Sequence, residues 1–181
     1  QSEVQTIIEG IDVMISKYRN ELSESTIKNY DNNLRHNITA YNELKKKDHK
    51  LLDLNKNFEL DFKNYLTDQG KATSTIGNQI RYLKSLCAKL KELDIEVNEA
   101  VFSFARSNSN KSIFYLSEAE LKRLRISNPI SKKLQEQKDI FIFQCYTGFR
   151  ISDLNRFNVH MVSEDRRFIK TRAYKTDEQI N

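Results

Sequence analysis

The stretch "KATSTIGNQIRYLKSLCAKLKELDI", Lys71–Ile95, decides how the first half of this chain folds. Apolar residues recur through it at steps of three and four, the spacing of one face of an α-helix. The stripe consists of Ile76, Ile80, Leu83, Leu86, Cys87, Leu90 and Leu93. Thr73 or Ser74 is placed to begin the helix, because a hydroxyl there accepts a hydrogen bond from the free backbone N–H groups of the first turn.

Three more helical patterns precede this stretch. The first spans Glu3–Tyr18, and the second follows a cap at Ser23 or Ser25 and keeps its apolar stripe as far as Leu44. The third ends at Gly70, and its inward residues are Phe58, Phe62 and Leu66. Four amphipathic helices of this length can bury one core between them. The sequence therefore predicts a mainly α protein that opens with a four-helix domain, residues 1–95.

Two segments are expected to lie outside packed helices. Residues 45–50, "KKKDHK", predict a solvated, charged connector. Residues 96–114 lack a helical period, and their Ser/Asn-rich end predicts an extended, mobile linker.

Residues 115–181 predict the start of a second domain. In "YLSEAELKRL", Ser117 caps a short helix and Glu120 completes a capping box. Pro129 separates it from a helix that runs to the Thr-Gly pair of "IFIFQCYTG", and a short helix, "SDLNRFN", follows. "RRFIKTRAYK" then has the composition of a strand that leads to a turn. Three helices with one and a half strands do not close a domain, so we expect an incomplete N-terminal part of an α+β domain.

The bulk composition narrows the class of protein. A net charge of +5 and a pI near 9.1 favour a polyanionic partner. Cys87 and Cys145 lie in apolar patterns and are expected to be buried thiols of a reducing compartment. The histidines lack metal-ligand spacing, and neither a membrane span nor a signal peptide is present in the sequence. We expect a cytoplasmic protein without metal or cofactor.

Polar and basic residues gather on two helices of the first domain. Hydroxyls and amides crowd the start of the helix at Lys71–Ile95, and such a helix N-terminus suits phosphate and base-edge contacts. A solvent-exposed face with an ordinary N-cap explains the same residues. The candidate DNA contacts are Thr26, Lys28, Asn29, Arg35, Lys71, Thr73, Ser74, Thr75, Asn78, Arg81, Lys84 and Lys111, joined in the second domain by Lys170 and Arg172.

The stretch "CYTGFRISDL" places a charged residue at the exit of the most apolar segment. Gly148 allows a sharp turn, and Arg150 is then held with its guanidinium available to a phosphate, with Asp153 behind it. A plain helix-end pair between Arg150 and Asp153 is the structural alternative. The basic strand that follows also has two interpretations. It is either an edge strand that its charges protect from aggregation or a strand that lies along a phosphate backbone.

These motifs resemble the tyrosine recombinases, the phage integrase family. "IFIFQCYTGFRISDLNRF" resembles the family's first catalytic motif, and "YLSEAELKRL" resembles the opening of its catalytic domain. "IKTRAYKTDE" is similar to the hairpin that carries a catalytic lysine, in the form common among integrases of Bacteroides-type mobile elements. The four-helix region resembles the SAM-like core-binding domain. The resemblance covers nearly the whole chain.

The resemblance implies roles for individual residues. Arg150 would be the first catalytic arginine on the scissile phosphate, Asp153 its supporting acid, and Lys175 the acid for the leaving 5′-hydroxyl. Lys170 and Arg172 are rivals for that last role. In this family a tyrosine attacks the phosphorus to give a phosphotyrosyl intermediate, and no metal is required.

The resemblance also implies what kind of molecule this chain is. The family's His-x-x-Arg motif and nucleophilic tyrosine find no match in the sequence, so we expect an inactive, DNA-binding fragment of a site-specific recombinase. Its partner would be double-stranded DNA in the bacterial cytoplasm, at the nucleoid, with no membrane. The fragment would be a monomer and the parent a tetramer on DNA. The alternatives are a non-catalytic DNA-binding regulator that uses the same helical clamp and a helical interaction module.

Overall fold

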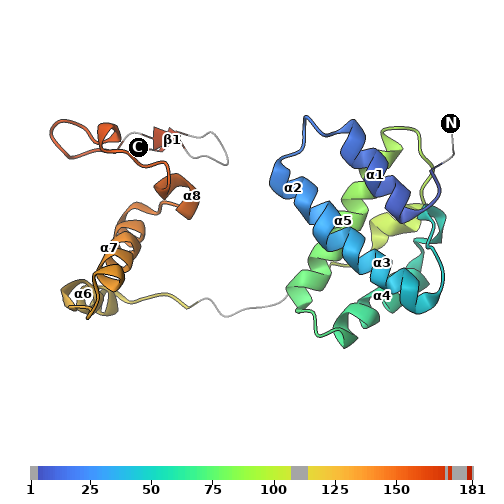
Figure 1. Ribbon diagram of the computed structural model, residues 1–181, viewed down its shortest axis with the longest axis horizontal. Helices are drawn as coiled ribbons and strands as arrows, with labels where there is room; N and C mark the ends of the chain where they lie inside the picture. Colours follow the sequence, from blue (N-terminus) through green and yellow to red (C-terminus); the bar gives the residue numbers. More distant parts are fainter. Residues whose placement is uncertain (1–3, 107–113, 170, 173–178, 181) are drawn as a thin grey trace. The chain divides into compact units, whose positions relative to one another are not determined.

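The structure is a computed structural model that describes residues 4–106, 114–169, 171–172 and 179–180. The chain divides into two compact units, Gln1–Lys111 and Ser112–Asn181. Both are built mainly from helices (Figure 1). Within the described residues, no helix has both the length and the apolar character needed to cross a membrane.

The first helix, α1, spans Ile7–Lys17 and begins later than expected. Thr6 caps it, because its hydroxyl accepts the N–H of Glu9 while the Glu9 carboxylate accepts the N–H of Thr6 at 2.8 Å. Just ahead of the cap, the carbonyl of Gln5 accepts the N–H of Leu51 at 2.8 Å. This extended pairing holds the chain out of the helix, so a start at Glu3 is wrong.

The predicted second helix is three consecutive segments: α2 (Glu24–Lys28), the π-helical η1 (Asn29–Arg35) and α3 (His36–Lys45). Ser23 is its N-cap. A π turn takes up one more residue than an α turn, so α3 is rotated by roughly 100° from a regular continuation. Leu44, expected inside, is exposed, whereas Ile38 and Tyr41 of the same predicted stripe are buried. The buried residues of α3 are Asn37, Ile38, Tyr41 and Asn42.

The third and fourth predicted helices are α4 (Lys56–Asp68) and α5 (Thr73–Lys91). Gly70, with φ +69°, forms the left-handed turn after α4, where a side chain would be strained. Ala72 is the N-cap of α5 and offers no side-chain acceptor, so the expected hydroxyl cap at Thr73 or Ser74 is wrong. The first backbone N–H groups of α5 are left without a side-chain cap.

The core of the first unit follows the predicted stripes of α4 and α5. Every residue predicted inside α4 is buried, and so are all those of α5 except Leu93, which is half-buried. An aromatic cluster between α3 and α4 joins Tyr41, Phe58, Phe62 and Tyr65. Burial raises the pKa of the Tyr41 hydroxyl to about 12 and that of the Cys87 thiol to about 12.

The connector at residues 45–50 is only partly solvated. His49 is buried beside the short 3₁₀ helix η2 (Leu51–Asp53). Its ring stacks on Tyr41 with centroids 4.9 Å apart, and its Nδ1 lies 2.7 Å from Oδ1 of Asn42. A polar partner inside the protein makes burial of the imidazole tolerable. The expectation of a fully solvated connector is therefore wrong at this residue.

The segment after Asp94 packs against the helices instead of leaving them. It forms the 3₁₀ helix η3 (Glu99–Ser103) and buries Val97, Val101 and Phe104. These residues complete the core beside α4 and α5. The extended linker expected from residue 96 does not begin there, because the unit needs this apolar segment to cover its helices.

The second unit begins with α6 (Glu118–Ile126), α7 (Lys132–Thr147) and α8 (Ile151–Leu154). The capping box of α6 is confirmed: the hydroxyl of Ser117 accepts the N–H of Glu120, and the Glu120 carboxylate accepts the N–H of Ser117 at 2.8 Å. The Ser117 hydroxyl also donates to Oε2 of Glu120 at 2.7 Å, and this hydrogen bond, followed by that from the Ser117 N–H, lowers the pKa of Glu120.

Beyond α8 lie the 3₁₀ helix η4 (Val159–Met161) and two short strands, β1 (Thr171–Arg172) and β2 (Gln179–Ile180), which pair antiparallel. The predicted strand does not begin at Arg166, which lies in a bend with φ +56°, and Ile169 pairs with Val162 only in an isolated bridge. Residues 170 and 173–178 of the predicted hairpin lie outside the described residues.

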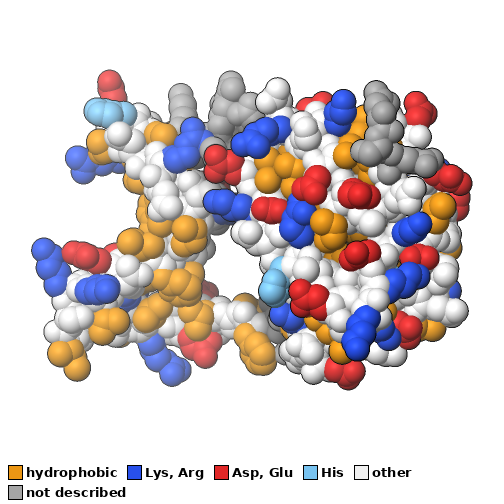
Figure 2. Space-filling model, turned by 45° about the vertical axis from the view of Figure 1, so that its right-hand side comes forward, with side chains coloured by type: hydrophobic (Ala, Val, Ile, Leu, Met, Phe, Trp, Pro, Cys, Tyr) orange, Lys and Arg blue, Asp and Glu red, His pale blue; other side chains and the backbone are white. Residues whose placement is uncertain are grey.

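Apolar side chains are exposed on the second unit, as Figure 2 shows. Ile140, Phe141 and Tyr146 of α7 are among them. Cys145 lies on the same exposed part of α7, so its predicted burial is wrong, whereas that of Cys87 is confirmed. The described residues of this unit leave that face of α7 uncovered.

Candidate nucleic-acid interface

The N-terminal turns of α5 carry the polar residues on which the sequence prediction rests. Lys71, Thr73 and Thr75 are exposed, whereas Ser74 and Asn78 are half-buried. Thr75 and Ile76 donate their N–H groups to the carbonyl of Ala72. The uncapped first turn presents backbone N–H groups and the positive end of the helix dipole beside these hydroxyls. This combination suits an anion.

Arg81 lies two turns further along α5, where α5 crosses η1. Its guanidinium carbon is 5.0 Å from the ring centroid of Tyr82, and that ring is 5.4 Å from the ring of Tyr30 on η1. Burial raises the pKa of the Tyr30 hydroxyl, opposed by a hydrogen bond with Ser85 and by the charge of Arg81. The exposed Arg81 is thus held against aromatic rings at the crossing of the two helices.

The candidates on α2 and at the start of η1 have partners of their own. The hydroxyl of Thr26 lies 2.9 Å from that of Ser23, and the Asn29 side-chain oxygen accepts from Asn33 at 3.0 Å. Lys28 is exposed at the end of α2. Figure 2 shows Lys and Arg side chains interspersed with Asp and Glu on the visible face of the first unit. On that face, local groups rather than a broad basic surface would supply any attraction for a phosphate.

Arg35 is engaged inside the first unit. Its Nη2 lies 2.6 Å from Oδ1 of Asp12, and its Nε lies 2.7 Å from Oδ1 of Asp31. The hydrogen bond with Asp12 is the main cause that raises the pKa of this guanidinium. The bridge ties α1 to η1 and occupies the guanidinium. Arg35 therefore stays outside the candidate interface.

Lys84 is also engaged within the first unit, because its Nζ donates to the carbonyl of Phe104 at 3.2 Å.

Gln79, near the start of α5, is buried, and its Oε1 has no hydrogen-bond partner among the described residues. Gln79 is one of the amides at the start of this helix that the sequence prediction grouped with the polar residues. Its spacing from Ile76 and Leu83 was the available sign that it faces the core.

Arg150 lies at the N-cap of α8, directly after the left-handed turn at Gly148, where φ is +67°. Its side chain is exposed, and its backbone N–H donates to Oδ2 of the buried Asp153 at 3.3 Å. Asp153 therefore supports the backbone at Arg150. This hydrogen bond does not test the predicted role of the Arg150 guanidinium.

A neighbouring aromatic residue, which sequence analysis missed, anchors this turn. Phe149 is buried, with ring centroids 5.7 Å from Phe143 on α7 and 6.1 Å from Phe157 after α8. Its carbonyl accepts from Nε2 of Gln144 at 3.0 Å. These contacts fix the backbone one residue before Arg150. The sequence does show an aromatic residue between Gly148 and Arg150. Its packing partners, however, could not be predicted from residue spacing.

The remaining candidates cannot be placed. Lys111, Lys170 and Lys175 lie outside the described residues. Arg172 belongs to β1, which the structure describes only as backbone pairing.

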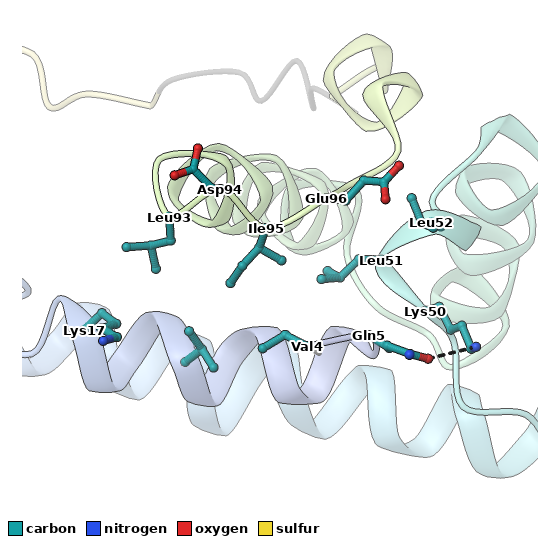
Figure 3. Close-up of a pocket in the computed structure, with 11 residues that line it drawn as sticks. Val4, Gln5, Lys17, Lys50, Leu51, Leu52, Leu93, Asp94, Ile95 and Glu96 are labelled. Atoms are coloured by element: carbon teal, nitrogen blue, oxygen red, sulfur yellow. Dashed lines mark hydrogen bonds between the residues drawn. The ribbon is translucent and has the colours of Figure 1, made fainter. Parts of the chain in front are cut away.

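A groove of about 1200 Å³ lies at the opposite end of α5 from Thr73. Figure 3 shows it between α1 and the chain that follows α5, with Ile95 and Leu51 toward its centre. Lys50 at one end donates to Oε1 of Gln5 at 3.1 Å. None of the candidate DNA contacts lines this groove, so it is separate from the candidate interface at the start of α5.

The comparisons with known proteins bear on the first unit. Residues 6–101 match the family model described as phage integrase SAM-like domain. The match runs from the cap of α1 into η3, where it ends at residue 101, and covers just over half of the chain. Neither the curated proteins nor the solved structures gave a match.

Proposed function

Because the chain belongs to the family of phage integrase SAM-like domains, we propose that its first unit is the core-binding module of a site-specific tyrosine recombinase. Membership of an integrase family implies a role in DNA binding. The finer assignment is supported by the motif around Arg150, which follows this module in the order that the resemblance implies. Double-stranded DNA is the proposed ligand.

The proposed DNA-binding surface is the start of α5 together with Arg81. One observation carries it: the first turn of α5 has no side-chain cap, and exposed Lys71, Thr73 and Thr75 surround it. A phosphate there would accept backbone N–H groups that are otherwise left to water. Lys28 on α2 extends the surface, while Arg35 and Lys84 serve the fold.

Binding to a labelled duplex, followed by fluorescence anisotropy over a range of salt, tests this surface. We expect Lys71→Ala and Arg81→Ala each to weaken binding several-fold on any sequence and to lower the salt slope by about one. Lys91→Ala, at the other end of α5, is the matched control and should bind as the wild type does. Equal affinity of all four proteins would contradict the proposed surface.

We further propose that Arg150 contacts the scissile phosphate, with Asp153 supporting its backbone, and that a cation of the basic strand protonates the leaving group. Lys175 is our first choice for that cation, ahead of Lys170 and Arg172. A guanidinium stabilises the charge of a pentacovalent phosphorus without a metal. The rigid turn anchored by Phe149 supports this role, since a catalytic group must be held in place before the substrate arrives.

A suicide DNA substrate tests the role of Arg150, in a form of the protein that contains a nucleophilic tyrosine. We expect a covalent protein–DNA adduct that is lost with Arg150→Ala and slowed by Lys175→Ala. Tight, sequence-specific binding without any adduct would instead favour the regulator, which needs backbone contacts but no arginine directed at one phosphate.

A further inference from the structure

A buried ion pair binds the chain at Ala105, just after η3. Glu59 on α4 is fully buried, and its Oε1 accepts the N–H of Ala105 at 2.9 Å. The same oxygen lies 2.5 Å from Nζ of Lys63, which also donates to the carbonyl of Ala105 at 2.5 Å. Both backbone polar groups of Ala105 are therefore bound by side chains of one helix.

Two more lysines strengthen this attachment. Lys56 donates to Oε2 of Glu59 at 2.5 Å, and Lys84 of α5 donates to the carbonyl of Phe104 at 3.2 Å. Burial alone would raise the pKa of Glu59, yet the hydrogen bonds from Lys56, Lys63 and the Ala105 N–H outweigh it and lower the pKa. The carboxylate consequently stays charged at neutral pH and keeps its hold on residue 105.

The chain just before η3 is attached through a single residue, Asn98. The backbone N–H of Asn98 donates to the carbonyl of Leu51 at 3.3 Å, and its Nδ2 donates to the carbonyl of Leu52 at 2.9 Å. Between these two attachments, η3 makes local hydrogen bonds and buries apolar side chains against α4 and α5. Residues 97–105 are thus a strap across two helices, fastened at both ends.

We propose that Glu59 and Lys63 form a latch that holds this strap closed and sets the point at which the chain leaves the first unit. Opening is a sub-global step that frees residues 97–105 while the helical core stays folded. At about 3.3 Å per residue, roughly nine freed residues add up to about 30 Å to the connector between the units. The inference rests on contacts within the first unit and holds whatever the unit binds.

Hydrogen exchange of the full chain, read by mass spectrometry, tests the latch. Lys63→Met keeps most of the apolar stem but removes the ammonium group, so we expect exchange in residues 97–105 to rise about tenfold or more. Peptides from the middle of α4 and α5 should exchange as in the wild type. Lys91→Met is the control, because Lys91 pairs with Glu99 of the same strap at an exposed position, 2.6 Å apart.

Glu59→Gln provides a second variant, and chymotryptic cleavage after Phe102 or Phe104 provides a second measurement. We expect faster cleavage at both sites in both variants and an unchanged rate in Lys91→Met. Exchange that rises equally throughout the first unit would overturn the proposal, since the cluster would then be an ordinary part of the core. Unchanged exchange in residues 97–105 would overturn it as well.

Discussion

At the scale of single residues, the first unit depends on polar groups that are buried with a partner. His49 is bound to Asn42 and stacked on Tyr41, and burial is the main cause that lowers its pKa from the ordinary 6.5, reinforced by Lys47 and opposed by Asp53. The folded protein therefore keeps this imidazole neutral at a pH at which the unfolded chain protonates it.

The stability of the first unit should consequently fall as the pH drops below about 6.5. There the unfolded chain binds a proton that folded His49 does not, so acid favours unfolding. Between pH 7.5 and 5.5 we expect the wild type to lose about 1 kcal/mol more than His49→Gln, measured by urea unfolding. His36→Gln alters an exposed histidine and should keep the wild-type difference. The same pH dependence in all three proteins would rule this explanation out.

Residue roles were the hardest part to predict from the sequence. Arg35, Lys84 and Gln79 have the composition of a DNA-binding surface, yet the first two are bound inside the unit and the third is buried. Their partners Asp12 and Phe104 are about twenty residues away in the chain, and helical spacing says nothing about such pairs. The exposure of Lys71 and Thr73 was easier to predict, because it follows from their place at the start of a helix, whereas their contact with DNA stays a prediction.

At the scale of elements, the turn between α7 and α8 shows how local chemistry positions a candidate catalytic residue. Gly148 takes the left-handed conformation that ends α7, and Phe149 then packs against Phe143 of α7 and against Phe157, which follows α8. Nothing lies within 4 Å of the place where a side chain on Gly148 would begin, so backbone strain alone opposes a substitution.

We expect Gly148→Ala to destabilise the second unit by about 1 kcal/mol, because an L-residue with a Cβ pays roughly that amount in the left-handed region. Gly148→Asn should cost less, since asparagine tolerates this conformation. Thermal unfolding of the full chain followed by circular dichroism compares the three proteins. Equal stability of Gly148→Ala and wild type would show that the turn relaxes to another conformation.

Helices were well predicted where a single apolar stripe packs into the core. The stripes of α4 and α5 are confirmed, as are the caps at Ser23 and Ser117. The π-helical η1 was missed because its apolar spacing also fits a regular helix. The 3₁₀ helix η3 was missed for the opposite reason, since its burial comes from contacts with distant helices and leaves no period in the sequence.

At the scale of the whole molecule, the strap decides where the first folding unit ends. The sequence prediction closed the four-helix domain at residue 95, but Val97, Val101 and Phe104 belong to the core. The family match ends at residue 101 and so also places the end of the unit after residue 95.

Two truncations distinguish these boundaries. A chain of residues 1–106 retains the strap and should unfold cooperatively in urea. A chain of residues 1–95 loses three buried side chains worth about 1.5–3 kcal/mol each, so we expect it to be less stable by roughly 5 kcal/mol or more. Since small domains have only about 5–15 kcal/mol to lose, the shorter chain should keep its helical core in water but unfold at a much lower urea concentration. Equal midpoints would mean that the strap adds nothing to the unit.

The π turn at Asn29–Arg35 has a consequence for variation in chain length. It lies between Lys28, on the proposed DNA side, and Tyr41, in the aromatic cluster, and its extra residue sets the rotational phase between them. Substitutions inside the turn leave that phase unchanged, but loss of one residue would advance α3 by about 100°. A one-residue gap in η1 would therefore change the direction of Lys28 relative to the aromatic cluster, and with it the proposed DNA-binding surface.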